Sequence, residues 1–276
     1  MKINIAYFTS TGNTLWLAQK AKKIFANNNH QVELFEVVKS DQKFFYNCDV
    51  IGIFYPVWSS NLPDPLRNVI SNHTADGNNK KIFLIGNCAQ FTGDTGLYWK
   101  KVLRNKGFEV FYIDHVEMPL NLNLPGFNFW DIPTGEKKNK ILSTAEDRIE
   151  DICSNILTFK NREEGKSFYE KLGGYSQRFF YWIENVWKWM FSVDQERCTY
   201  CKLCYKICPT KNIVLKNKNK IEFGSNCILC LKCYNLCPEN AVLIGKWSKN
   251  TNKYQRYKGP CKEIGPVIYR NYVNDE

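Results

Sequence analysis

Apolar and polar residues follow two alternating patterns along the first 160 residues. Compact apolar runs, each typical of a strand, occur at residues 3–8, 32–37, 49–55, 81–86 and 107–115. Between and after them, apolar residues recur every three to four positions, which predicts helices at residues 15–27, 63–72, 95–106 and 138–159. Strands that alternate with helices form a parallel sheet covered on both faces. The pattern therefore predicts an α/β fold with a doubly wound, five-stranded parallel sheet.

Three of these strands lead into loops that are candidates for ligand binding, at residues 9–14, 56–61 and 87–93. Ligands of open parallel sheets bind beyond the carboxyl ends of the strands, so we expect the three loops to converge on one site. The candidate binding residues are Thr9, Ser10, Thr11, Gly12, Asn13, Thr14, Pro56, Val57, Trp58, Asn87, Cys88, Phe91 and Gly93.

The loop at residues 9–14 has the composition of a phosphate site. It places one glycine among short hydroxyl side chains directly before a helix, so that backbone N–H groups and the helix dipole face an anion. It lacks the Gly-Lys-Ser/Thr of a Walker loop, and no strand is followed by Gly-x-Gly-x-x-Gly. The alternative is an ordinary N-cap, in which the threonines only close a turn.

Eight of the twelve cysteines lie in two runs of identical spacing. The runs are Cys198-x2-Cys201-x2-Cys204-x3-Cys208-Pro209 and Cys227-x2-Cys230-x2-Cys233-x3-Cys237-Pro238. With this spacing, three cysteines of a run hold one [4Fe–4S] cluster and the fourth ligates the other cluster. We therefore assign one cluster to Cys198, Cys201, Cys204 and Cys237, and the second cluster to Cys227, Cys230, Cys233 and Cys208.

The residues that follow each run repeat as well, because the second run lies 29 positions after the first. Each half is expected to form a cluster loop, a short helix and a short strand, as in an internal duplication. Zinc knuckles and disulfides are the alternatives. Zinc sites use Cys-x2-Cys pairs, however, and would leave the third and fourth cysteines of each run without a role.

Three segments lie outside these patterns. Residues 117–137 form an aromatic insertion, which is either a functional lid or docking surface, or a flap that covers the core. Residues 161–194 form an aromatic helical linker, whose stretch at 175–191 is expected to pack between two domains, with a membrane-surface helix as the alternative. Residues 246–276 are expected to form an extended basic tail.

Net charge and cysteine content indicate which partners and which cellular compartment to expect. The formal net charge is +11, but the lysines are scattered, which argues against nucleic acid and favours an acidic redox partner such as a ferredoxin or reductase. Twelve cysteines without a signal peptide indicate a reducing, cytoplasmic setting. No apolar run approaches the ~20 residues that a membrane-spanning helix needs. The sequence is also compatible with a homodimer. The remaining thiols are expected to be buried, at Cys48, Cys88, Cys153 and Cys261.

Both halves of the chain resemble known families. Residues 1–160 resemble a flavodoxin, whose FMN phosphate loop is similar to Thr9-Ser-Thr-Gly-Asn-Thr14. The resemblance implies that the other two loops flank the isoalloxazine and that Trp58 stacks on it. Residues 195–245 resemble an α+β two-cluster ferredoxin of the bacterial 2[4Fe–4S] type. Together they resemble the EFR-type flavodoxin–ferredoxin fusion proteins, over essentially the whole chain.

This combination implies an electron-transfer protein of an anaerobe with FMN and two [4Fe–4S] clusters as cofactors. Each cluster passes single electrons and FMN holds one or two, so the chain would be an internal relay. The expected function is a carrier or intermediary reductase in low-potential metabolism. The alternatives are an enzyme that reduces a small molecule at the flavin, and a redox sensor.

Overall fold

The computed structural model describes residues 1–40, 42–181, 185–216 and 220–264. They form two compact units that are interleaved along the chain. The first unit contains Met1–Thr9, Asn13–Met118 and Asn139–Phe179. The second unit contains Ser10–Gly12, Pro119–Lys138 and the chain from Phe180 onward. The segment expected as an insertion thus belongs to the second unit.

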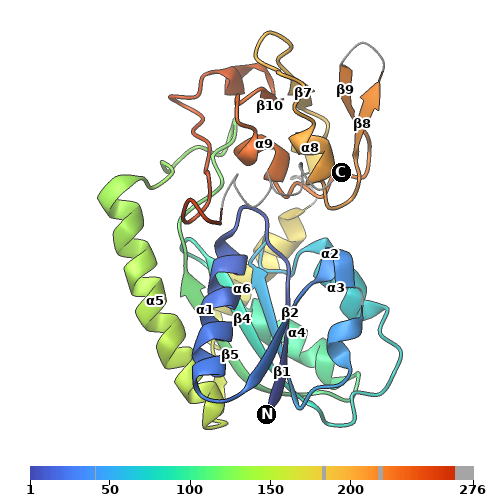
Figure 1. The fold of residues 1–276 in the computed structure, drawn as a ribbon, viewed down its shortest axis with the longest axis vertical. Helices are drawn as coiled ribbons and strands as arrows, with labels where there is room; N and C mark the ends of the chain where they lie inside the picture. The colour runs from blue at the N-terminus through green and yellow to red at the C-terminus, as the bar shows by residue number, and fades with distance from the viewer. Residues whose placement is uncertain (41, 182–184, 217–219, 265–276) are drawn as a thin grey trace. The chain divides into compact units, whose positions relative to one another are not determined.

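A parallel sheet of six strands forms the centre of the first unit, in the order β2-β1-β3-β4-β5-β6 (Figure 1). The strands are β1 Lys2–Tyr7, β2 Gln31–Glu36, β3 Val50–Pro56, β4 Lys81–Cys88, β5 Glu109–Glu117 and β6 Arg162–Glu163. Every residue of β3 is buried, as predicted for a central strand covered on both faces. The first five strands have the order of the flavodoxin-like doubly wound fold, so the predicted fold class is confirmed.

Helices cover both faces of this sheet. They are α1 Asn13–Asn27, α2 Val37–Ser40, α3 Asp64–Ser71, α4 Thr95–Arg104 and α5 Gly135–Leu157, with a 3-10 turn, η1, at Lys43–Phe45. The connections through α1 and α3 run in opposite directions across the sheet, and because such crossovers are right-handed, these two helices lie on opposite faces. Lys20 of α1 pairs with Glu146 of α5, which places α1 and α5 side by side (Figure 1).

Two features of the sheet differ from the prediction. Strand β4 continues through Asn87 and Cys88, so these residues end a strand and do not begin a loop. The sheet also has a sixth strand, because β6 pairs with β5 over two residues. A strand of two residues is too short to show a hydrophobic period, so no local pattern predicts it.

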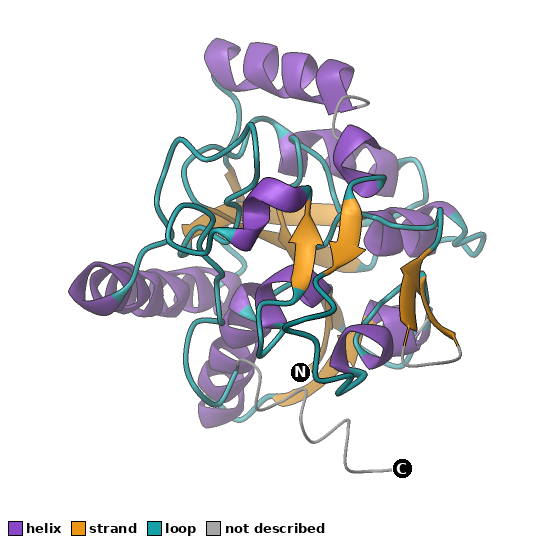
Figure 2. Ribbon diagram, turned by 90° about the horizontal axis from the view of Figure 1, so that it is seen from above, coloured by secondary structure: helices purple, strands orange, loops and turns teal. Residues whose placement is uncertain are grey.

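Short elements and two antiparallel pairs of strands form the second unit (Figure 2). One pair joins β7 Phe191–Val193 to β10 Val242–Ile244, and the other joins β8 Ile213–Lys216 to β9 Lys220–Phe223. The helices are α7 Asn185–Lys188, α8 Leu203–Lys206 and α9 Lys232–Leu236, with a 3-10 turn, η3, at Lys246–Lys249. Each cysteine run therefore contains a short helix and leads into a short strand, as the duplication predicts.

Part of the core of the second unit comes from the aromatic insertion. Leu124 is fully buried in a cluster of apolar side chains from both cysteine runs. The indole N–H of Trp187 donates to the Pro125 carbonyl at 3.0 Å, and the Tyr234 hydroxyl donates to the Asn123 carbonyl at 3.3 Å. These contacts favour the interpretation of the insertion as a segment that covers a core.

The aromatic linker forms a helix, α6 Phe168–Phe180, that begins earlier than expected. On one side its Gly173 and Gly174 lie against Phe91 and Asp94 of the first unit. The opposite side is solvent-exposed, with Phe168, Leu172, Tyr175 and Phe179 each more than half accessible. Residues 182–184 of the stretch at 175–191 lie outside the described residues. No helix in the described ranges is both long and apolar enough to cross a bilayer.

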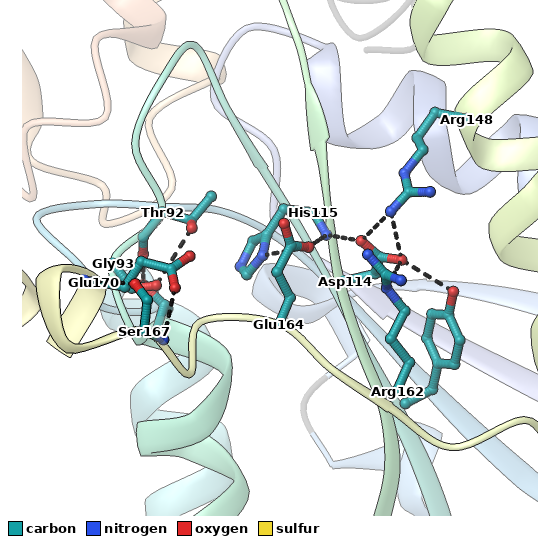
Figure 3. Close-up of polar contacts among 11 residues, drawn as sticks. Thr92, Gly93, Asp114, His115, Arg148, Arg162, Glu164, Ser167 and Glu170 are labelled. Atoms are coloured by element: carbon teal, nitrogen blue, oxygen red, sulfur yellow. Dashed lines mark hydrogen bonds and ion pairs between the residues drawn. The ribbon is translucent and has the colours of Figure 1, made fainter.

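A buried carboxylate ties β5 to α5 and β6 (Figure 3). Asp114 is fully buried, and it accepts hydrogen bonds from Arg148 Nη2 and Arg162 Nε, both at 2.7 Å. The hydroxyl of Tyr112 donates a further hydrogen bond at 3.0 Å. Burial and a hydrogen bond with Glu164 raise the pKa of Asp114, whereas the hydrogen bond from the His115 N–H and the charge of Arg148 oppose this rise.

Replacing Asp114 with Asn should lower the free energy of unfolding by about 3 kcal/mol, because the loss of one partner leaves a buried ion pair incomplete. The two arginine side chains are 34% and 44% exposed, so their hydration keeps the loss at the lower end of the usual range. Urea unfolding followed by circular dichroism measures it. Asp151→Asn, an exposed substitution on α5, is the matched control and should change stability by less than about 0.5 kcal/mol. Equal stability of the two variants would contradict this role.

Candidate functional site

The side chains of the loop at residues 9–14 are buried. The loop's polar residues Thr9, Ser10, Thr11, Asn13 and Thr14 are each at most 6% exposed. Among the residues that the structure describes, Ser10 Oγ finds no hydrogen-bond partner. A buried hydroxyl without a partner is unfavourable, and an anion that accepts its hydrogen bond would remove the cost. The loop therefore fits a phosphate group.

Two residues of this loop make contacts within the second unit. Thr11 Oγ1 accepts a hydrogen bond from Asn121 Nδ2 at 2.8 Å. Gly12, with a φ of +106°, lies against Pro260 and Ile264. A Cβ at Gly12 would stand 2.8 Å from the Ile264 carbonyl oxygen, so both the backbone conformation and the available space require glycine.

Thr14 and Asn87 connect the start of α1 to the end of β4 in the first unit. Asn87 Nδ2 donates to Thr14 Oγ1 at 2.8 Å and to the Tyr55 carbonyl at 3.1 Å. The pairing brings residues of the first and third candidate segments together, as expected for strands that end at the same edge of a sheet. In this structure the Asn87 amide positions the protein's own elements.

The second candidate segment forms a tight turn that begins at Trp58. The N–H groups of Trp58 and Asn61 donate to each other's carbonyls at 3.0 and 2.8 Å. Ser59 and Ser60 between them have φ values of +45° and +54°, which defines a type I′ turn. The ring of Trp58 is half-buried and meets Phe8 edge-on at 5.5 Å.

Before this turn, Pro56 ends β3 and the Val57 N–H donates to the Asn87 carbonyl at 2.9 Å. The third segment follows β4, where burial, with a smaller contribution from Glu117, raises the pKa of Cys88 to about 12. The Cys88 thiol is therefore protonated at neutral pH. Gly93 has a φ of +56°, a conformation that favours glycine.

Helix α6 holds the second and third segments together within the first unit. Ser60 Oγ donates to Gln177 Oε1 at 2.7 Å. Arg178 Nη1 donates to the Ser60 carbonyl at 2.9 Å and to Asp94 Oδ1 at 2.6 Å. Phe91 lies over Gly173. The sequence did not predict the roles of Gln177 and Arg178, because local periodicity does not report contacts between distant segments. The adjacent Gly173 and Gly174 were the available signal that α6 packs closely against another segment.

Four cysteines from both runs line one cavity of the second unit. They are Cys198, Cys201, Cys204 and Cys237, the set that the spacing predicted for one cluster. Burial raises the pKa of Cys204 to about 12, and the neighbouring thiols contribute to the shift. The apolar part of the cavity wall includes Val193, Leu203, Ile221 and Val242.

The other four cysteines, Cys208, Cys227, Cys230 and Cys233, interact with one another. Burial raises the pKa of Cys230 to about 12, and the nearby Cys208 and Cys227 add to the rise while Lys232 opposes it. Burial and the same neighbours raise the pKa of Cys233 well above its usual value. None of the twelve cysteines forms a disulfide bond. No three His, Cys, Asp or Glu side chains of the described ranges are grouped closely enough to hold a single metal ion.

The two cysteine runs repeat their backbone conformation as well as their sequence. Left-handed residues occur at equivalent positions, with φ between +51° and +60°, at Tyr200, Lys202 and Lys211 in the first half and Leu229, Leu231 and Asn240 in the second. The last cysteine of each run accepts a backbone N–H bond on its sulfur at 3.2 Å, from Asn212 for Cys208 and from Ala241 for Cys237. This repetition confirms the internal duplication.

Comparison with known proteins agrees with this organisation. Residues 197–242 match the family model of a 4Fe-4S dicluster domain. A search of curated proteins found no match to the chain. The strand order and the family match together define a chain that joins a flavodoxin-like fold to a 4Fe-4S dicluster domain.

Similar solved structures include flavodoxins and a larger flavoprotein. A flavodoxin from Streptococcus pneumoniae TIGR4 is 15% identical, with a TM-score of 0.40, over 57% of this chain and 99% of that chain. The two-electron reduced flavodoxin of Megasphaera elsdenii is 18% identical, with a TM-score of 0.38, over 52% and 98%. A flavo di-iron protein from Thermotoga maritima is 11% identical, with a TM-score of 0.41, over 57% and 35%.

Proposed function

We propose that this chain is an electron-transfer flavo–iron–sulfur protein that relays electrons between two [4Fe–4S] clusters and FMN. The observation that carries the proposal is the position of Cys237, which belongs to the second run but lines the cavity of Cys198, Cys201 and Cys204. Exchange of the fourth ligand between runs is the characteristic arrangement of two-cluster proteins. The family match over residues 197–242 supports the same assignment.

The chain's own residues would hold the clusters as two sets of thiolates, with Cys208 completing the set of Cys227, Cys230 and Cys233. Bound clusters supply one-electron transfer, and FMN accepts one or two electrons. Cys204 is buried, which keeps water from its sulfur, whereas Cys201 is exposed. Hydrogen bonds to the sulfurs of Cys208 and Cys237 favour the anionic ligands, and such bonds contribute to cluster potentials.

The FMN phosphate would lie at the start of α1, where Ser10 supplies an unpaired hydroxyl and the first N–H groups of the helix face an anion. Trp58 would flank the isoalloxazine from the second segment. The partners that fit the +11 charge are acidic redox proteins, because charge complementarity accelerates their association.

Anaerobically prepared protein should hold about eight iron atoms per chain, and Cys237→Ser should remove about half of them. Cys237→Ser should resemble Cys201→Ser in its remaining electron paramagnetic resonance signal and differ from Cys230→Ser, because Cys237 serves the first run's cluster. Iron and sulfide analysis with these spectra tests the assignment, and Cys48→Ser is the control outside both runs. A Cys237→Ser protein that matches Cys230→Ser would contradict cross-ligation.

Ser10→Ala should weaken FMN binding by about 10- to 100-fold, since a hydrogen bond to a charged group contributes roughly 1.5–3 kcal/mol. Quenching of FMN fluorescence by the flavin-free protein measures the dissociation constant. Ser154→Ala, on the exposed side of α5, should leave the affinity unchanged. Equal affinities for the two variants, or a preference for FAD, would count against the phosphate loop.

NADH and NADPH should reduce the loaded protein far more slowly than dithionite or a reduced ferredoxin does. Hydride transfer requires a nicotinamide held against the flavin, and no strand of this sequence is followed by a Gly-x-Gly-x-x-Gly fingerprint. Anaerobic stopped-flow spectra follow flavin and cluster bleaching separately. Rapid bleaching by NADH without an added reductase would replace the relay with the small-molecule reductase as the function of this chain.

A further inference from the structure

Arg256 is a cation enclosed in the second unit, with only 9% of its surface exposed. Its guanidinium donates to the carbonyls of Tyr254 at 2.6 Å and Ser248 at 3.0 Å. It also lies 3.4 Å from the centre of the Tyr234 ring, and its Nε is buried without a partner in the described part of the chain. Within the described residues Arg256 therefore meets carbonyl oxygens and an aromatic ring, and it forms no ion pair with a carboxylate.

Lys258 follows on the same segment and contacts a predicted cluster ligand. Its Nζ donates to the Cys237 carbonyl at 2.7 Å and to Asn240 Oδ1 at 2.8 Å. The charges that act on Lys258 are those of Cys237, Arg256 and Glu239, and Glu239 is exposed. Arg256 Nη2 also donates to the Val242 carbonyl at 3.4 Å, and Val242 lines the cavity of the four cysteines. Both cations thus contact residues that line this cavity.

The internal duplication shows that these cations are specific to one half. The second run has a buried lysine of its own, Lys232, which is 3% exposed and acts on Cys230. The equivalent position of the first run, 29 residues earlier, is Leu203. The first run thus lacks the buried cation of the second, and the segment with Arg256 and Lys258 supplies positive charge to Cys237 from outside the duplicated part.

A cation in this position affects the two redox states of a cluster unequally. A buried cation without a counter-ion is unfavourable, and a cluster with four thiolate ligands supplies negative charge. When the cluster gains one electron, no bond forms or breaks and its charge becomes more negative by one unit. Because Coulomb attraction grows with charge, a neighbouring cation stabilises the reduced form more than the oxidised form.

We propose that Arg256 and Lys258 raise the reduction potential of the cluster held by Cys198, Cys201, Cys204 and Cys237. This inference rests on the proposed function for that ligand set. Neither residue is a cluster ligand, and both act on the cluster through their positive charge. The segment at 256–258 therefore raises the reduction potential of this cluster, and its Tyr257 is also buried in the second unit.

The test measures both cluster potentials in the full-length loaded protein by anaerobic voltammetry. Lys258→Met and Arg256→Met should each move one cluster to a more negative potential, by about tenfold in the reduction equilibrium, which is about 59 mV for one electron. The other cluster should not move. Lys258→Arg keeps the charge and should restore the potential. Lys253→Met, which removes an exposed charge from the same segment, is the matched control.

Lys232→Met shows which voltammetric signal belongs to which cluster, because it should shift the potential of only the cluster held by Cys208, Cys227, Cys230 and Cys233. Potentials unchanged in both Lys258→Met and Arg256→Met would overturn the proposal. A shift in Lys258→Arg as large as that in Lys258→Met would also overturn it, since packing and not charge would then be responsible. If Lys258→Met loses iron, Arg256→Met compared with Arg256→Lys decides the question. Wild-type protein that binds no iron–sulfur cluster would contradict the proposed function itself.

Discussion

Under the proposed ligand assignment, the second unit depends on one geometric constraint: each run of closely spaced cysteines must turn three sulfurs toward a common centre. With two residues between cysteines, the chain achieves this through left-handed residues, at Tyr200 and Lys202 and again at Leu229 and Leu231. None of these is glycine, and the left-handed conformation costs such residues roughly 1–2 kcal/mol each. On the same assignment, the free energy of cluster binding would offset this strain, because binding to ligands that are gathered only in the folded state is coupled to folding.

The same constraint explains why the second unit recruits distant segments. The matched dicluster domain covers only residues 197–242, and a domain below about 60 residues buries a small share of its chain's surface and is only marginally stable. Leu124 of the aromatic insertion and Phe191 of β7 extend its core. Tyr257, fully buried beyond the second run, adds further apolar surface. The segment between β5 and α5 thus supplies the second unit with buried apolar surface that residues 197–242 lack.

The sequence predicted elements with strong periodicity and missed those specified by distant contacts. Continuous apolar runs identified β3 and β4, and identical cysteine spacing identified the set that lines the cavity. Strand β6 was not predicted because two residues are too few to show a hydrophobic period. Its pairing with β5 accompanies the ion pair between Arg162 and Asp114. The interleaving of the units also escaped, since residues 119–138 have no period and their partners lie far along the chain.

Helix α6 shows how an element outside every recognised pattern shapes the candidate site. The turn after Trp58 places Ser59 and Ser60 in left-handed conformations, which the surrounding structure must stabilise. Gln177 and Arg178 supply that support by hydrogen bonding to Ser60, and Arg178 also fixes Asp94 before α4. Gly173 and Gly174 allow the close approach. A binding site is only as well ordered as the residues that hold its loops, so α6 is a structural part of the candidate site in the first unit. Because the glycine side of α6 contacts Phe91 and Asp94, the aromatic side chains on its other side are exposed.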